Sequence, residues 1–264
     1  MDLQLLVAAV NKDEIKLSNE MNIGSDTIIA NQGAAFGYVR YKHNGYDVEA
    51  YSFAEKGVGL NRNTALMRAS ADVVLFADDD IVYEDDYRDK VLKEFENNPK
   101  ADMILFNVNV APERKTYEIT EYGRVHLYNC GRYPTYSMAV RLNRIRENNI
   151  CFSLLFGGGA KYSNGEDSLF IRDCIKSGLK VYKTPVVIGT EQDTPSTWFE
   201  GYTEKFFYDR GVLYRYLYGV LAGIMARRFL IKNSKKMCDT VTKKQALKLM
   251  KKGIRDAKKR NDEA

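Results

Sequence analysis

The sequence predicts an α/β protein with a doubly wound, mostly parallel sheet, followed by a helical and basic C-terminal extension. Apolar runs that suit buried strands alternate with helical patterns over the first 110 residues. The apolar run 73–77 is followed at once by Asp78-Asp79-Asp80, at the kind of strand end where ligands of such sheets collect. From Arg227 onward there are 14 Lys/Arg against 4 Asp/Glu, whereas the whole chain carries only +5, so the basic character lies in the tail.

The first half of the chain supplies most of the expected sheet. The expected strands lie at residues 3–10, 26–30, 38–42, 46–53, 73–77 and 103–110. The expected helices are a short one that Asn11 caps and that ends near Asn22, one at 61–70, and one at 83–97 that Asn98-Pro99 stops. Asn44-Gly45 predicts a two-residue hairpin turn between two of the strands.

The second half contains more loops. We expect loops or hairpins over 111–135, short strands at 138–140, 179–182 and 186–189, and a loop at the glycine-rich residues 156–160. Ser163 and Glu166 fit a capping box, and the helix that they open should end at Lys176 or Ser177 with Gly178 behind it. From residue 196 onward the chain looks helical. Near its end, four apolar residues recur at helical spacing: Leu247, Met250, Ile254 and Ala257.

Several classes of protein lose support from composition and missing motifs. The four cysteines form no CxxC pair, so they indicate reduced cytosolic thiols rather than a zinc site or a disulfide framework. The N-terminus has no basic region of a secretory signal, and the apolar stretch 212–225 is short for a bilayer span. No Walker loop, HExxH or Gly-x-Ser-x-Gly occurs, and His43 and His126 stand without a partner motif.

The aspartate triplet indicates a bound cation. Mg²⁺ and Mn²⁺ prefer oxygen ligands and usually keep substrate phosphates and waters in their shell. Three adjacent anions at a strand end therefore suit a divalent metal held together with a diphosphate. The alternative is an acidic turn in which Asp80 caps the following helix.

Three further positions could carry chemistry. Arg62 stands near Gly57 and Gly59 at a helix start, where it could pair with phosphate, although it could equally be an exposed arginine. Asp167 falls in the first turn of a helix, whose dipole favours the ionised form that a general base needs, but which favours any acid there. Asp193 could add a ligand oxygen and is a weaker candidate.

Taken in order, these pieces resemble family 2 glycosyltransferases of the GT-A fold over roughly residues 3–210. The resemblance rests on Gly59-Leu60-Asn61-Arg62-Asn63, on the segment 71–80 with its three aspartates, and on glycines 157–159 followed by Gly165-Glu166-Asp167. The segment 195–202 is also similar to a bacterial subgroup that builds surface polysaccharide. The implied domains are a GT-A catalytic domain at 1–205, with donor half 1–110 and acceptor half 111–205, and a helical extension at 206–264.

The resemblance also implies roles for individual residues. Asp80 and Asp78 would hold Mn²⁺ or Mg²⁺, and Asp78 and Asp79 would face the ribose and sugar of the donor. Asp167 would be the base, beside an acidic Glu166, and Arg62 would lie near the nucleotide. Asn31 stands where the family usually has an aspartate facing the nucleobase. The family's usual Pro-x-Tyr-Asn is here 8–11, which leaves Asn11 as a weaker candidate.

The resulting hypothesis is an inverting, metal-dependent transfer from a UDP-sugar to a glycan or polyprenyl-linked acceptor. The alternative is an inactive relative that binds nucleotide-sugars without turnover. We expect a cytoplasmic protein. For the basic tail, contact with an anionic membrane on the inner face of the cell membrane is favoured over nucleic acid, and a solvated helix packed on the body remains the alternative.

Overall fold

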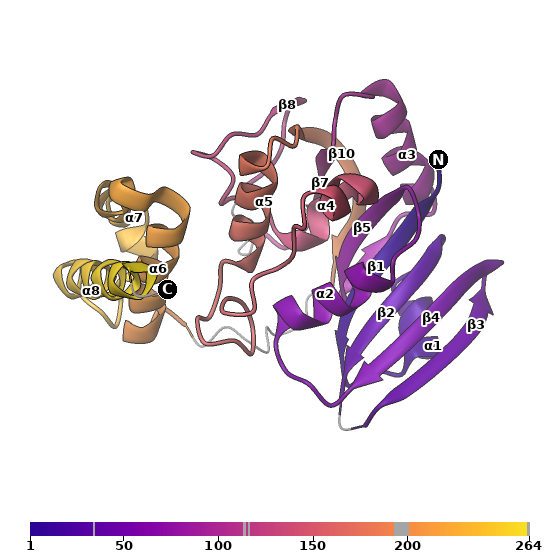
Figure 1. Ribbon diagram of the computed structural model, residues 1–264, viewed down its shortest axis with the longest axis horizontal. Coiled ribbons are helices and arrows are strands. Elements are labelled where there is room, and N and C mark those ends of the chain that lie inside the picture. Colours follow the sequence, from indigo (N-terminus) through magenta and orange to yellow (C-terminus); the bar gives the residue numbers. More distant parts are fainter. Residues whose placement is uncertain (34, 113–114, 116, 193–200, 263–264) are drawn as a thin grey trace.

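The computed structural model describes the chain except residues 34, 113–114, 116, 193–200 and 263–264. A twisted mixed sheet forms its centre, and a group of C-terminal helices lies at one side of it (Figure 1). The α/β prediction with a helical extension is confirmed.

The sheet has the strand order β3-β4-β2-β1-β5-β9-β7-β10-β6, and β8 pairs with β10. Its parallel part consists of β4, β2, β1 and β5 together with the pair β7 and β10, whereas β3, β6, β8 and β9 run antiparallel to their neighbours. The strands are β1 (Leu3–Val10), β2 (Asp26–Gln32), β3 (Gly37–His43), β4 (Tyr46–Phe53), β5 (Val73–Asp78), β6 (Ile81–Tyr83), β7 (Met103–Asn109), β8 (Gly123–Arg124), β9 (Met138–Arg141) and β10 (Val181–Glu191).

Helices cover both faces of this sheet. One face packs against α2 (Val58–Arg68), α4 (Leu142–Glu147) and α5 (Glu166–Lys176), and the other against α1 (Glu14–Glu20) and α3 (Tyr87–Asn97). The strands β1 and β5 are buried almost throughout, because they contribute apolar side chains to both hydrophobic clusters. The carboxyl ends of the central parallel strands therefore stand at one edge of a rigid scaffold.

Local sequence signals placed several elements correctly. β1 has its expected bounds, and Asn44 and Gly45 both adopt the positive φ that a tight hairpin turn between β3 and β4 requires. The loop at 156–160 is confirmed, and α5 ends before Gly178, which has a φ of +86°.

Other boundaries were wrong. Asp13, not Asn11, caps α1, because its carboxylate accepts from the Lys16 N–H, and α2 begins at Val58 rather than Asn61. The expected helix at 83–97 is α3, which ends at Asn97 as expected but begins only at Tyr87, because Tyr83 belongs to the edge strand β6 and pairs with β10. β10 continues through Pro185 as one strand, with register shifts that accommodate the proline.

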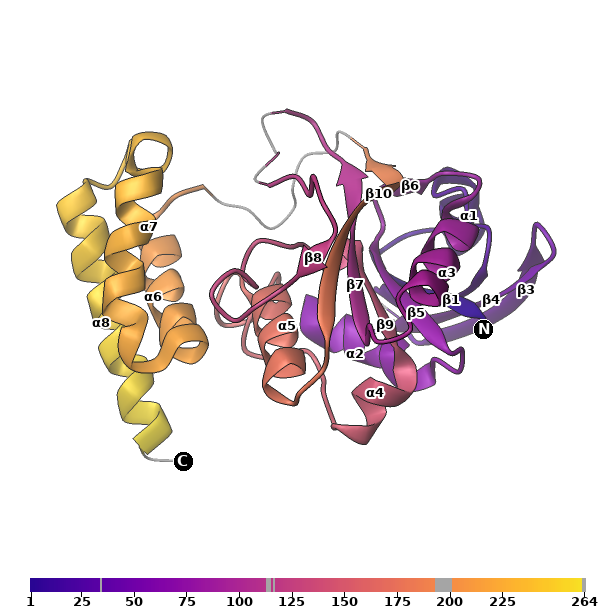
Figure 2. The same cartoon turned by 90° about the horizontal axis from the view of Figure 1, so that it is seen from above.

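The C-terminal helices are α6 (Glu204–Tyr218), α7 (Ala222–Met237) and α8 (Lys243–Asp262), with the short 3-10 turn η2 (Gly219–Leu221) between α6 and α7. They pack side by side in both views (Figures 1 and 2). The apolar stripe of α8 faces inward: Met250 and Ala257 are buried, and Leu247 and Ile254 pack against the same cluster. This stripe is therefore covered by α6 and α7, which are parts of the helical extension and not of the sheet domain.

None of the described helices combines the length and the hydropathy needed to cross a bilayer.

Two glycines allow α6 and α8 to touch backbone to backbone. A Cβ atom at Gly211 would lie 2.1 Å from the Met250 carbonyl oxygen, and one at Gly253 would lie 2.2 Å from the Tyr208 carbonyl oxygen. A side chain at either position would force the two helices apart. In α7, by contrast, a Cβ atom at Gly223 would meet nothing within 4 Å.

We therefore predict opposite effects for two glycine-to-alanine changes. Gly211→Ala should lower the free energy of unfolding by about 3 kcal/mol, because it overpacks a backbone contact. Gly223→Ala should leave it unchanged or raise it by about 0.5–1 kcal/mol, because alanine is the better helix former. Urea denaturation followed by circular dichroism measures both, and equal losses in the two variants would contradict the contact between α6 and α8.

Candidate active site

Asp78, Asp79 and Asp80 lie where β5 ends and turns into β6. Because β1 and β5 are parallel neighbours, this turn lies beside the end of β1. The Asp79 carboxylate accepts from the Val10 N–H at 3.3 Å and lies 3.7 Å from the Lys12 ammonium. Burial raises the pKa of Asp79, and Lys12 opposes that shift. Asp80 caps no helix, since β6 follows it, so the acidic-cap alternative is wrong.

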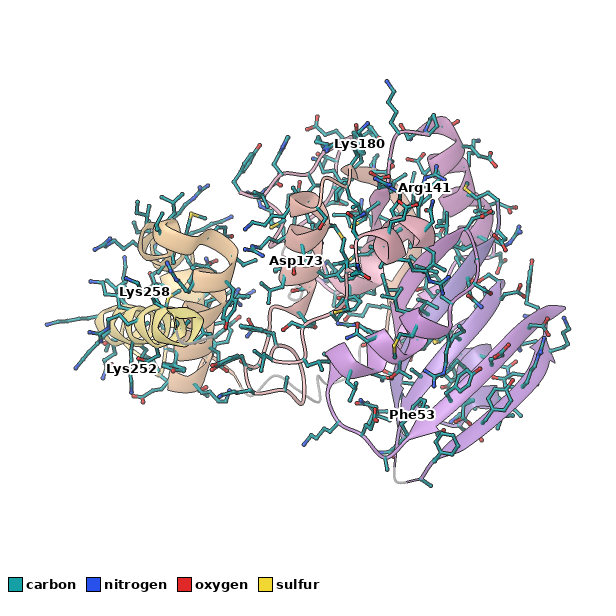
Figure 3. All side chains as sticks on the ribbon, viewed as in Figure 1. Phe53, Arg141, Asp173, Lys180, Lys252 and Lys258 are labelled. Atoms are coloured by element: carbon teal, nitrogen blue, oxygen red, sulfur yellow. The ribbon has the colours of Figure 1, made fainter. Side chains whose placement is uncertain are left out.

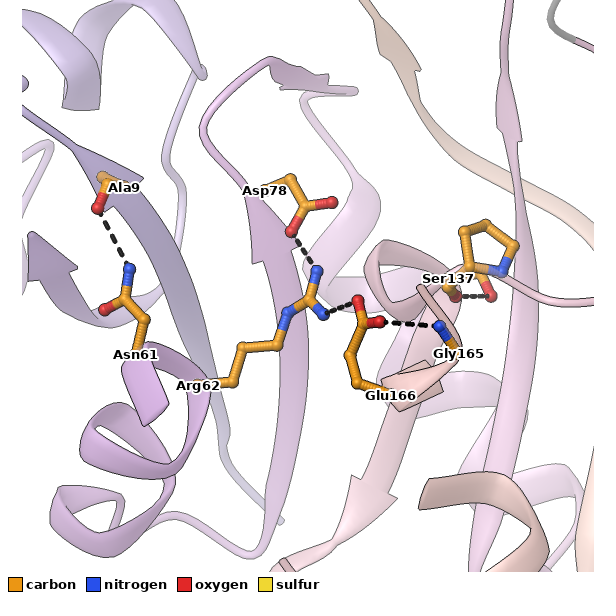
Figure 4. A network of polar contacts seen from close by, with 8 residues as sticks. Ala9, Asn61, Arg62, Asp78, Ser137, Gly165 and Glu166 are labelled. Carbon is orange, nitrogen blue, oxygen red and sulfur yellow. Dashed lines mark hydrogen bonds and ion pairs between the residues drawn. The ribbon is translucent and has the colours of Figure 1, made fainter. Parts of the chain in front are cut away.

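Arg62 on α2 joins two carboxylates that are distant in sequence. Its guanidinium donates to Asp78 Oδ1 at 2.7 Å and to Glu166 Oε1 at 2.9 Å (Figure 4). The side chain is only 5% exposed and lies over the Phe152 ring, so the alternative of an exposed arginine is wrong. Burial alone would lower the pKa of Arg62, but the two carboxylates outweigh it and raise that pKa above its ordinary value.

Glu166 is the first residue of α5, and other parts of the chain pack closely around it. Gly165 precedes it with a φ of +114°, and the Gly165 N–H donates to Glu166 Oε2 at 3.1 Å. The capping box between Ser163 and Glu166 is wrong: Gly165 stands at the cap, and Glu166 is held by Arg62 and Gly165 instead. A Cβ atom at Gly157 would lie 2.9 Å from the Glu166 carboxyl group, so the glycine-rich loop lies directly against this carboxylate.

Asp167 is the next residue and stays partly accessible to solvent. The backbone N–H and the hydroxyl of Ser168 both donate to its Oδ1 atom. Burial of the carboxyl group, together with the charge of Glu166, raises the pKa of Asp167 to about 6, although Ser168 and Arg62 favour the ionised form. A carboxylate with this pKa is ionised near neutral pH yet basic enough to accept a proton.

The helix α6 holds the loop that leads to these acids. The buried Asp209 accepts from the Ser163 N–H at 3.0 Å and pairs with Lys205, whose ammonium also donates to the Lys161 carbonyl. A Cβ atom at Gly165 would lie 2.5 Å from the Leu213 side chain. The start of α5 is thus fixed from one side by α2 and from the other by α6.

The remaining sequence candidates have defined places. Asn31 is buried, and its amide bonds the Lys12 backbone and Glu14, which shapes the loop after β1. Asn11 has a φ of +51° and donates from its backbone to the Gln32 carbonyl. Asp193 and most of the segment 195–202 fall outside the described residues.

Sequence reasoning missed three polar residues near this edge. Lys12 approaches Asp79, Gln32 bonds both backbone groups of Gly57, and the Asn61 amide donates to the Ala9 carbonyl at 3.0 Å. The glycines at 57 and 59 and the pair Asn61-Arg62 were visible in the sequence. The residues that Lys12, Gln32 and Asn61 contact are, however, more than 20 positions away along the chain. Within the part of the chain that the structure describes, no group of three or more His, Cys, Asp or Glu side chains is arranged to hold a metal ion by itself.

We predict that removing the Arg62 guanidinium destabilises the protein strongly. Arg62→Met should lower the free energy of unfolding by about 3 kcal/mol, because it leaves Asp78 and Glu166 without their shared counter-charge. Arg62→Lys should fall between this variant and the native chain, since one ammonium cannot reproduce the fork of a guanidinium. Urea denaturation measures the change.

Arg68→Met is the matched control on the same helix. Arg68 is exposed and lies over the rings of Tyr51 and Phe53, so its loss should cost less than about 1 kcal/mol. A loss for Arg62→Met that is no larger than this would contradict a buried bridge.

Comparisons with known proteins give one family model and several solved structures of the same fold. Residues 38–155 match the family model described as "Glycosyl transferase family 2", a little under half of the chain that includes Arg62 and the three aspartates. The match ends before Glu166 and Asp167. No curated protein matches the chain in sequence.

Solved structures share the fold at low sequence identity. S. aureus TarS 1-349 aligns with a TM-score of 0.65 at 12% identity, over 99% of this chain and 82% of that one. The same protein in complex with UDP-GlcNAc gives 0.66 at 14%, over 99% and 83%. The mannosyltransferase PcManGT from Pyrobaculum calidifontis, in complex with GDP-Man and Mn²⁺, gives 0.52 at 13%, over 98% and 75%. The family match therefore falls on part of a chain that shares its fold with TarS and with a mannosyltransferase.

Proposed function

We propose that this chain transfers a sugar, with inversion and with the help of a divalent metal, from a UDP-sugar to a hydroxyl of a glycan or lipid-linked acceptor. The observation that carries the proposal is the Arg62 bridge, which ties the aspartate turn to the start of α5. The aspartate turn, as the candidate cation site, and the candidate base would thereby belong to one site. The complexes of TarS with UDP-GlcNAc and of PcManGT with GDP-Man support a nucleotide-sugar as donor.

The donor would lie over the carboxyl ends of β1 and β5. Asp78 and Asp79 would face its ribose and sugar, Asn31 its base, and Arg62 would keep Asp78 in place. The Lys12 ammonium, which lies beside Asp79, would offset part of the diphosphate charge. Asn11 and Asp193 remain weaker candidates for the same contacts.

The chemistry of the aspartate turn suits Mn²⁺ or Mg²⁺, with Asp80 and Asp78 as the residues that would hold it. One oxygen of Asp78 bonds Arg62, which leaves the other outside that ion pair. Because the protein presents few ligands, oxygens of the donor and water would complete the shell. A bound ion would stabilise the negative charge that develops on the leaving diphosphate. The Mn²⁺ in the PcManGT complex supports this assignment.

Asp167 would act as the base. It would accept the proton of the acceptor hydroxyl while the hydroxyl oxygen attacks the anomeric carbon from the face opposite the diphosphate, and the bond from that carbon to the diphosphate oxygen breaks. Its raised pKa suits this role, since a base titrating near neutral pH combines ionisation with proton affinity. Glu166 would support it by holding the helix start against Arg62.

We also propose a cytoplasmic setting and a place in bacterial surface-polysaccharide synthesis. The support is the similarity of segment 195–202 to that subgroup of the family. An acceptor of this kind carries many equivalent hydroxyls, so the loop around α5 would select among them.

The base assignment predicts a pH profile. A base must be ionised, so kcat/KM should fall as pH drops through about 6, where Asp167 becomes protonated. Asp167→Asn should reduce kcat about 100-fold or more, abolish this acidic limb and leave donor binding nearly intact. UDP release with a panel of UDP-sugars and acceptors measures turnover, and calorimetry measures binding.

Asp173→Asn on the same helix is the matched control, since Asp173 is half exposed and pairs with Arg172. It should behave like the native chain. Unchanged turnover in Asp167→Asn would remove the base assignment. Tight donor binding without any release by the native chain would favour the inactive relative.

If the metal assignment is correct, donor binding should require a divalent metal. Excess EDTA should abolish donor binding measured by calorimetry, and added Mn²⁺ should restore it, because the diphosphate would then lose and regain its counter-charge. Asp80→Asn should weaken binding in Mn²⁺, whereas Asp86→Asn, on an exposed acid before α3, should not. Full activity in excess EDTA would count against a metal.

A further inference from the structure

The turn η2 and the helix α7 expose a row of large aliphatic side chains. Val220 is 91% exposed and Ile231 is 72% exposed, and Leu221 and Ile224 are also mostly in solvent. Single exposed apolar residues are ordinary, but a row within 12 residues of one segment marks an interaction surface.

Cations share this face of the helix. Arg227, Arg228, Lys232 and Lys235 are all exposed, and positions 224, 228, 231 and 235 follow each other at helical spacing. Between residues 219 and 238 the sequence contains no Asp or Glu. We call this surface the α7 face: Val220, Leu221, Ile224, Arg227, Arg228, Ile231, Lys232 and Lys235.

The orientation of the α7 face is fixed by packing on the opposite side of the helix. Ala222, Ala226 and Leu230 are buried against α6 and α8. Lys252 and Lys258 are exposed on the neighbouring helix α8 (Figure 3). The face is therefore a permanent feature of the folded chain and needs no rearrangement to become accessible.

We propose that the α7 face lies on an anionic lipid bilayer. Its aliphatic side chains would enter the region between the head groups, and its arginines and lysines would contact lipid phosphates. Charge complementarity favours this occupant over a second copy of the chain, since an isologous contact would place these cations against each other. Nucleic acid would match the cations but not the exposed aliphatic side chains, which cannot stack on bases.

The test is flotation of the full chain with vesicles. The chain should float with equimolar phosphatidylglycerol and phosphatidylcholine vesicles, should not float with phosphatidylcholine alone, and should release as salt is raised. The double variant Ile224→Ser/Ile231→Ser should bind the anionic vesicles at least about tenfold more weakly than the native chain. The double variant Arg228→Ser/Lys235→Ser should lose binding to the same extent.

Met67→Ser is the control, because Met67 is 70% exposed on α2, outside this face. It should bind like the native chain. All these substitutions lie at exposed positions, and unchanged thermal melts would exclude unfolding as the cause. The readout is lipid binding alone, so it can fail while the glycosyl transfer proposed above holds, and the reverse.

Several results would overturn the proposal. Equal flotation with neutral and anionic vesicles, no flotation at all, or native binding by both double variants would each do so. Light scattering that shows self-association of the native chain, lost in Ile224→Ser/Ile231→Ser, together with no lipid binding, would assign the face to contacts between copies instead.

Discussion

The geometry of the site depends on one buried guanidinium. Arg62 can be buried only where carboxylates neutralise it, and the two that do so come from the end of β5 and the start of α5, 104 residues beyond Arg62 in the sequence. Burying such ions costs desolvation free energy, and the Arg62 Nε atom has no hydrogen-bond partner among the described residues. Buried ion pairs are often no more stabilising than well-packed apolar residues of similar volume. We therefore interpret the buried ion pairs of Arg62 as fixing the distance between the aspartate turn at 78–80 and the acids Glu166 and Asp167.

The second support of the site comes from a part of the chain that the family match does not reach. The match ends at residue 155, yet the start of α5 is held by Asp209 and Leu213 of α6. Phe156, Tyr162 and Leu169 also belong to the same hydrophobic cluster as the C-terminal helices. The division near residue 205 stays a prediction. One hydrophobic cluster spans it, and α6 contributes to the position of the candidate base.

Sequence patterns predicted what depends on neighbours along the chain, and they failed where distant partners decide. The run of apolar residues in β1 and the pair Asn44-Gly45 are local signals, and both were placed correctly. Glu166 satisfies a local capping rule, but Arg62 and Gly165 take its carboxylate, so the helix begins without that cap. The aspartates and the Glu166-Asp167 pair were visible as acids of the right type. The burial of Arg62 was not, because no local pattern reveals that two carboxylates will meet it.

In the basic tail too, local sequence patterns could not reveal which helix would be covered by packing. Both α7 and α8 carry apolar residues at helical spacing among lysines and arginines, so periodicity alone cannot say which helix is covered. Gly211 and Gly253 decide it, because they let the backbones of α6 and α8 touch and so draw the apolar stripe of α8 inside. The helix α7 buries only alanines and a leucine there and keeps its isoleucines outside. Positive charge is thus shared by both helices, whereas among the described residues of α6 to α8 the large exposed aliphatic side chains belong to α7 and its preceding turn. On the proposed bilayer, long-range attraction and short-range insertion would therefore be carried by different residues of these helices.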